Sequence, residues 1–298
     1  MIALACVLSC TALARAGDDK AADLTPLKWA STTQSPRFAA ATGGDAGLYR
    51  LCGERDTAMV QVAAAIVRRR IDGKRPFDER ALRTLTRAAG VPQLWPHAWS
   101  LAGVSDARVV TAKMKRWLGR RPTGGVYRCG IARGVTASGR PVIAAVNTRV
   151  LADLAPLPRR MAMSRWLSLS ATLHVSADHA KVVLLGPRGR PKRVLASLSH
   201  GTVRSRFMLD QRGRWLVQVV AGLPSGPKPV AEAVIFVGAE PPADLEVVAA
   251  KAGSGGDVGT LLTRLDKART SEGIGKLQHD RRLDKVALAH ARAMARAR

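Results

Sequence analysis

The sequence of 298 residues predicts a mixed α+β fold arranged in successive blocks. Apolar residues recur at helical spacing, next to a candidate β-hairpin, within residues 46–155. They alternate with polar residues, as in strands, within residues 160–240, and they return to helical spacing within residues 260–298. We therefore expect an N-terminal α+β domain, a central β-sandwich and a C-terminal helical pair. Hydrophobic residues make up 47% of the chain, which is enough to form a core and excludes wholesale disorder.

The N-terminus is typical of an export signal. Residues 2–14 form an apolar run that falls short of the roughly 18 to 20 residues needed for a membrane span, and no other run reaches that length. Ala14 and Ala16 are small residues in the positions that signal peptidase prefers. We therefore predict that residues 1–16 are a signal peptide and that the protein is secreted or periplasmic. The alternatives are a lipoprotein anchored at Cys10 and a buried cytosolic helix.

The first folded block follows a predicted linker. Residues 17–45 are rich in Ala, Thr, Ser, Gly and Asp, and the stretch 31–36 in particular predicts a linker. Residues 46–155 form the predicted α+β domain. Its expected elements are helices over 54–70, from Asp78 to Gly90 and over 106–118, and then a hairpin of strands Val126–Val135 and Pro141–Thr148.

Cysteine usage agrees with export. After removal of residues 1–16 the chain keeps Cys52 and Cys129, and an isolated pair in an oxidising compartment predicts a disulfide. In the chain-entropy model such a long loop contributes about 4 kcal/mol. The alternative is two unrelated buried thiols. The spacing does not resemble a zinc site, because no paired Cys or His ligands lie nearby.

Residues 160–240 predict an all-β domain. Five alternating strands are separated by turns rich in Gly, Pro and Asp, a spacing that favours a small sandwich of immunoglobulin-like type. Trp166 and Trp215 are the expected core anchors. Modules of this kind are usually spacers or adhesion units, and the fold alone does not define a function. The expected strands are Trp166–Val175, Lys181–Leu185, Val203–Leu209, Trp215–Ala221 and Val230–Val237.

The C-terminal block begins after a second predicted linker, residues 241–259, which contains a Gly- and Ser-rich run. Two helices are expected within residues 260–298. The first has its apolar stripe at Leu261, Leu262, Leu265 and Ala268. Asp280 is placed to cap the second helix.

The run from Leu261 to Met294 resembles the opening of a CAP domain. This is the extracellular family of cysteine-rich secretory proteins, antigen 5 and plant pathogenesis-related proteins, which also has bacterial SCP-like members. The family opens with a helix bearing Asn-x-x-Arg, and Asp266 stands in place of that Asn. The matching residues are Arg269, Gly273, Leu277, Leu283, Ala287, His290 and Met294.

The resemblance covers residues 260–298 and implies an α-β-α sandwich. The family's central sheet, and its two His and two Glu cavity residues, come after the matched segment, so no cation, sterol or lipid site is carried over. We expect either a truncated product or helices that pack on the earlier domains. The hairpin from Cys129 to Val146 is similar to the closing hairpin of CAP domains, which would make residues 46–155 a divergent relative rather than an ordinary α+β domain.

No catalytic constellation is recognisable. His97 lies within Trp95–Trp99, which is either an aromatic-walled site or a packed loop. His174, His179 and His200 lack metal-type spacing. The chain has no Gly-x-Ser-x-Gly, His-Glu-x-x-His or P-loop motif. We therefore predict no catalytic residues, no metal and no cofactor.

The formal net charge is +26, and the excess is spread over all the blocks. A dedicated nucleic-acid surface concentrates its charge, and an aromatic content of 4% argues against base stacking, so nucleic acid is not favoured as a partner. The leading hypothesis is an exported, non-catalytic protein that binds an envelope or extracellular component. The alternatives are a secreted hydrolase with a site near Trp95–Trp99 and a cationic protein that binds an anionic polymer.

Overall fold

The computed structural model describes residues 26–35, 45–122, 124–243, 245, 258–271 and 275–296. Helices and strands are mixed along the chain, so the predicted α+β class is confirmed. The chain divides into two compact units, Met1–Ala249 and Ala250–Arg298. Within the described residues no helix is both long and apolar enough to cross a membrane. The predicted signal peptide, Cys10 and the cleavage site at Ala16 lie outside the described residues.

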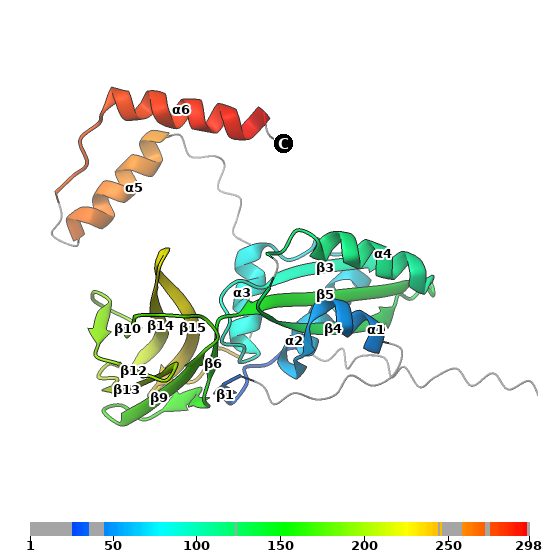
Figure 1. Ribbon diagram of the computed structural model, residues 1–298, viewed down its shortest axis with the longest axis horizontal. Coiled ribbons are helices and arrows are strands. Elements are labelled where there is room, and N and C mark those ends of the chain that lie inside the picture. The colour runs from blue at the N-terminus through cyan, green and yellow to red at the C-terminus, as the bar shows by residue number, and fades with distance from the viewer. Residues whose placement is uncertain are drawn as a thin grey trace, which may run out of the picture. The chain divides into compact units, whose positions relative to one another are not determined.

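We call residues 46–150 of the first unit the first sheet region. It contains a four-stranded sheet that lies between two helical layers (Figure 1). The strand order is β2-β4-β5-β3. Helices α2 and α3 pack on one face of this sheet, and α1 and α4 pack on the other. The elements are α1 Ala46–Cys52, β2 Glu54–Arg55, α2 Thr57–Ile71, α3 Glu79–Ala88, β3 His97–Ala102, α4 Ala107–Leu118, β4 Val126–Val135 and β5 Pro141–Val150.

Aspartate residues cap the N-termini of α2, α3 and α4, the three longer helices of this region. Asp56 accepts from the backbone N–H groups of Ala58 and Met59, and Asp78 and Asp106 each accept one such bond in the first turn of their own helix. Such caps satisfy backbone donors that have no partner inside the helix. The second and third predicted helices and the hairpin are confirmed. The first was placed too early, because its cap is Asp56.

Three short elements in this region were not predicted from the sequence. Helix α1 and strand β2 occupy the segment just before α2, and β3 begins at His97, where a site loop or packed loop was expected. A seven-residue helix and a two-residue strand are too short to show a periodic pattern. Strand β3 pairs with β5 along its whole length, so tertiary pairing decides its conformation.

Two further sheets face each other over a shared core in residues 151–238, which we call the two-sheet region. One has the order β12-β13-β9-β6, and the other has the order β11-β10-β14-β15-β8. We call the first the hydroxyl-rich sheet, after the serines on its outer side. The strands are β6 Ala152–Leu154, β8 Arg160–Met161, β9 Trp166–Leu173, β10 His179–Leu185, β11 Lys192–Val194, β12 Ser197–Ser199, β13 Thr202–Met208, β14 Gly213–Leu223 and β15 Gly226–Val237.

The two tryptophans expected in this core behave differently. Trp215 is 1% exposed, and its indole N–H donates to the Gln211 carbonyl, so its prediction is confirmed. Trp166 is 60% exposed, so its prediction as a core anchor is wrong. Along β9 the side chains of Leu167 and Leu169 point into the core. Because side chains alternate along a strand, Trp166 points to the opposite side.

The predicted linker at 31–36 is also wrong where the structure describes it. Strand β1 (Thr32–Thr33) pairs with β7 (Leu157–Pro158). On either side of β1 the backbone bonds Ala88, Gly90 and Leu154, so the segment joins the end of α3 to the two-sheet region. Serine and threonine predict a loop, but here their backbone groups find strand partners.

The second unit contains the two predicted helices, α5 (Val258–Ser271) and α6 (Arg281–Arg296). The Asp266 carboxylate accepts from the Leu277 backbone N–H at 3.1 Å, and Arg269 donates to the Gly275 carbonyl at 2.8 Å. Asp280 accepts from the Arg282 N–H, which confirms it as the cap of α6. No side chain of α6 is buried.

Candidate functional site

A disulfide anchors one end of the first sheet. Cys52 is the last residue of α1, Cys129 lies in β4, and their sulfurs are bonded across a sequence separation of 77. The predicted pairing is therefore present. Both residues are fully buried. The bond fixes the C-terminal end of α1 against the sheet.

Two polar side chains bind the last backbone carbonyls at this end of α1. Arg121 donates to the carbonyls of Leu51 and Cys52 at 2.7 and 2.8 Å. The Asn147 amide donates to the Cys52 carbonyl at 2.6 Å. The last carbonyls of a helix have no partner within it, so these donors complete the helix end. In the sheet, Asn147 lies between His97 of β3 and Cys129 of β4 in register.

A cavity of about 430 Å³ opens beside this helix end. Three aromatic residues line it, namely Trp95, Trp117 and Tyr127. Trp117 stacks on Trp99 with ring centroids 6.1 Å apart. The Tyr127 hydroxyl donates to the Pro122 carbonyl at 2.7 Å. Neighbouring groups therefore hold two of the three rings, and the cavity has rigid aromatic walls.

Four cationic side chains also line the cavity. Arg120, Arg121, Arg149 and Lys228 all line it, and Tyr127 is the register partner of Arg149. The Arg121 guanidinium lies 4.4 Å from the Tyr127 ring centroid, and the Lys228 ammonium lies 5.0 Å from that of Trp95. We call these residues, together with Trp95, Trp117 and His97, the basic aromatic pocket.

The lining of this pocket contains no Asp or Glu. Arg121 is already bonded to the end of α1. Within the part of the chain that the structure describes, Arg120, Arg149 and Lys228 make no ion pair with a carboxylate. The pocket therefore presents uncompensated positive charge next to apolar rings. Such a wall suits a ligand that combines an anionic group with a planar or apolar part.

The pocket is poor in reactive groups. Among its lining residues there is no Ser, Thr or Cys, and the Tyr127 hydroxyl is bonded to a backbone carbonyl. His97 is exposed and is the one histidine of the lining. The described residues hold no cluster of His, Cys, Asp and Glu that could bind a metal. The arrangement can bind and orient a ligand, and the lining offers no Ser, Thr or Cys nucleophile.

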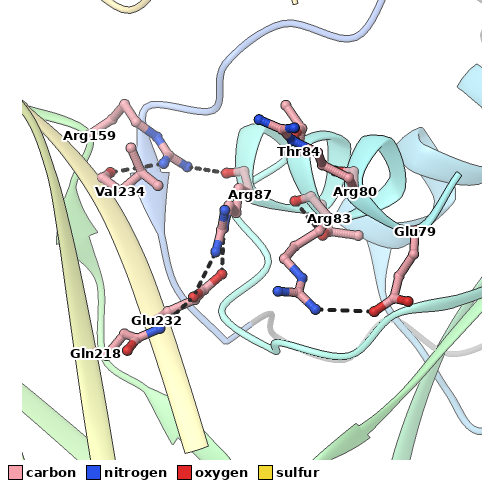
Figure 2. A network of polar contacts seen from close by, with 10 residues as sticks. Glu79, Arg80, Arg83, Thr84, Arg87, Arg159, Gln218, Glu232 and Val234 are labelled. Carbon is pink, nitrogen blue, oxygen red and sulfur yellow. Dashed lines mark hydrogen bonds and ion pairs between the residues drawn. The ribbon is translucent and has the colours of Figure 1, made fainter. Parts of the chain in front are cut away.

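A second polar network lies between the first sheet region and the two-sheet region (Figure 2). Arg159 is 1% exposed and donates to the carbonyls of Ala30, Val234 and Arg87. Arg87 pairs with Glu232, which also accepts from Gln218. Burial lowers the pKa of Arg159 to about 10. Every one of these charges has a partner, which is the pattern of a structural contact.

A third polar network contains His174, one of the histidines considered in the sequence analysis. His174 lies 2.8 Å from Asp153, whose other oxygen accepts from the buried Arg128 at 2.6 Å. Burial by itself would raise the pKa of Asp153, but the hydrogen bonds from His174 and Arg128 outweigh it and hold that pKa below its usual value. His200, in the turn before β13, lines one surface cavity together with His174, whereas His179 lies at the start of β10 and does not line it. The structure therefore brings two of the sequence-predicted histidines to one cavity and places His97 in the basic aromatic pocket.

The chain matches no known protein-family model, and no curated protein matches it.

Sequence reasoning found part of this pocket. It singled out Trp95, His97 and the disulfide, but it missed Tyr127, Arg149 and Lys228. The register of the predicted hairpin could have paired Tyr127 with Arg149. Tyr127 lies two residues before Cys129, and Arg149 lies two residues after Asn147, the cross-strand partner of Cys129. No local signal connects Lys228, which lies on β15 of the two-sheet region, to the other pocket residues.

Proposed function

We propose that this chain is an exported, non-catalytic binding protein that holds an anionic ligand in the basic aromatic pocket. The observation that carries the proposal is the composition of the pocket wall, where Arg120, Arg149 and Lys228 surround aromatic rings and no carboxylate lines the cavity. Cations without a carboxylate partner can bind the carboxylate, phosphate or sulfate of a ligand without first breaking an ion pair. The rings supply apolar contact area.

Export to an extracellular or periplasmic location is part of this proposal. The buried Cys52–Cys129 disulfide supports it, because structural disulfides persist mainly in oxidising compartments. The partner would then be an envelope or extracellular component, and anchoring at Cys10 stays the alternative to free secretion. Mass spectrometry of the native protein tests this directly. A mass that begins at Gly17 and lacks two hydrogens is the expected result, and a mass that includes residues 1–16 contradicts it.

The finer fold assignments are proposals of the same kind. Two sheets that share one core support an immunoglobulin-like sandwich in residues 160–240. The bonds made by Asp266 and Arg269 support a CAP-like opening in residues 260–298, since these two residues belong to the matched motif. The helix–sheet–helix layering of residues 46–155 is compatible with a divergent relative of the CAP sandwich.

The pocket is tested with 4-nitrophenyl phosphate, which joins an aromatic ring to a phosphate. Calorimetric titration at low salt should show binding that weakens as salt rises, while neutral 4-nitrobenzyl alcohol should bind far more weakly. The double variant Arg149→Gln/Lys228→Gln should bind the phosphate at least tenfold more weakly, which is about 1.4 kcal/mol. Arg204→Gln/Arg206→Gln removes the same charge from the two-sheet region and should leave binding unchanged.

Three results would contradict the proposal. One is equal binding of the neutral and charged compounds. Another is an equal loss in both double variants, which would indicate an effect of net charge alone. The third is release of nitrophenolate that disappears in His97→Ala while the fold persists, because that result would favour the secreted hydrolase near Trp95–Trp99.

A further inference from the structure

The outer side of the hydroxyl-rich sheet is chemically distinct from the core side. Along β9 and β13 the inward residues, such as Leu169 and Phe207, are buried in the shared core. Strands β9, β13 and β12 contain no acidic residue. We define the outer sheet surface by six exposed residues, Trp166, Ser168, Ser197, Arg204, Arg206 and Met208.

The strand register brings these residues together. Trp166 is opposite Met208, and Ser168 is opposite Arg206. Arg204 is opposite Ser197 on β12. The Arg206 guanidinium lies over the Trp166 ring, 5.0 Å from its centroid. The surface is therefore an exposed indole, held beside an arginine, with serine hydroxyls on neighbouring strands.

Two large apolar side chains of this surface are exposed to solvent. Trp166 is 60% exposed and Met208 is 40% exposed, although large apolar side chains are usually turned inward in a two-sheet arrangement. Arg204 and Arg206 make no ion pair with a carboxylate in the described residues. Exposed Trp and Arg are the side chains most enriched at binding hot spots. The surface thus has an aromatic platform and two available cations.

We propose that the outer sheet surface binds an acidic polysaccharide. The apolar face of a sugar ring would lie on the face of Trp166 that Arg206 leaves uncovered, and the carboxylates of neighbouring sugars would bind Arg204 and Arg206. These two arginines are two residues apart on one strand and so about 7 Å apart, which lets a polymer with regularly spaced carboxylates meet both. Ser168 and Ser197 can exchange hydrogen bonds with sugar hydroxyls.

The same observations disfavour two other partners. Proteins that bind single-stranded nucleic acid usually stack successive bases on several aromatic rings, whereas this surface has one. A protein partner is usually met by a closely packed apolar centre, whereas serine and arginine surround Trp166 and Met208. This inference goes beyond the pocket and does not depend on it.

The test uses polygalacturonate as the acidic polymer and pullulan as the neutral one, with affinity electrophoresis or calorimetry of the full chain. Polygalacturonate should bind and pullulan should not. Trp166→Ala and Arg204→Gln/Arg206→Gln should each weaken binding at least tenfold. Since all three residues are exposed, these variants should keep their fold, which circular dichroism checks. Arg188→Gln/Arg193→Gln removes the same charge from exposed sites outside this surface and should change binding less than twofold.

Each alternative has its own outcome. An equal loss in the Arg188→Gln/Arg193→Gln control would overturn the proposal in favour of nonspecific charge attraction. Tighter binding of single-stranded DNA than of polygalacturonate, lost in Trp166→Ala, would assign the surface to nucleic acid instead. Full binding by Trp166→Ala would remove the indole from the site. The pocket variant Arg149→Gln/Lys228→Gln should bind the polymer normally, so failure here is distinguishable from failure of the proposed function.

Discussion

Two groups of arginines in the first unit have opposite surroundings. At the contact between the first sheet region and the two-sheet region, Arg159 is buried and donates to the carbonyls of Ala30, Val234 and Arg87. Figure 2 shows the last two of these bonds and the pairing of Arg87 with Glu232. In the basic aromatic pocket, Arg120 and Arg149 are exposed and line a cavity without a carboxylate. The first group completes the protein's own hydrogen bonds, and the second has bonding capacity left for a ligand.

The physical reason is the cost of removing a charge from water. A buried guanidinium is tolerated only where acceptors replace its hydration, so its surroundings are dictated by the fold. An exposed guanidinium keeps its hydration and has no such requirement. When exposed cations cluster around a cavity, their mutual repulsion opposes folding slightly. Such a cluster therefore indicates ligand binding rather than a contribution to stability.

The largest expected loss of stability comes from removing Arg159, a member of the buried group. Arg159→Ala removes the donor to the carbonyls of Ala30, Arg87 and Val234 and should lower the free energy of unfolding by about 4 kcal/mol, as measured by denaturant titration. Its neighbour Arg160 is exposed and pairs with Glu240, so Arg160→Ala should cost about 0.5 kcal/mol.

The pocket supplies a second control for this comparison. Arg149→Gln should leave the free energy of unfolding within about 0.5 kcal/mol of the native value, because no carboxylate in the described residues depends on it. If Arg159→Ala and Arg149→Gln destabilised the protein equally, the distinction between structural and ligand-binding arginines would be wrong.

A smaller effect, with a pH dependence, comes from Asp153. Its folded pKa lies below its unfolded value, so it stabilises the fold above the unfolded pKa of about 4, and that contribution is lost as pH falls through the folded pKa. Asp153→Asn removes the carboxylate that accepts from Arg128 and contacts His174, and should cost about 2 kcal/mol at pH 7. Denaturant titrations at several pH values should show this difference shrinking toward acid pH.

The exposed pair of Asp210 and Lys192 provides the control for Asp153. Asp210 is fully exposed, so Asp210→Asn should change stability much less at every pH. A difference between Asp153→Asn and the native protein that did not shrink as the pH fell below the unfolded pKa of about 4 would contradict an electrostatic origin. It would indicate instead that the substitution alters packing.

Local chemistry predicted several elements correctly. Asp78 and Asp280 lie just before helices and cap them, and Gly139 lies at the turn of the predicted hairpin with a positive φ of 75°. The pairing of Cys52 with Cys129 followed from elimination, because no other cysteines remained after the predicted signal peptide. In each case the deciding information lies within a few residues or in a count, so it can be read from the chain.

Residue type and spacing thus established the α+β class, the caps at Asp78 and Asp280, the hairpin and the disulfide of this protein. Tertiary structure alone decided that Trp166 is exposed while Trp215 is buried, and that Lys228 of β15 joins Trp95 at the pocket. Capping and turn formation depend on neighbours along the chain, whose distances are set by covalent geometry. Burial and pocket formation depend on which strands pair and which faces meet, and these contacts join residues that are distant in the sequence.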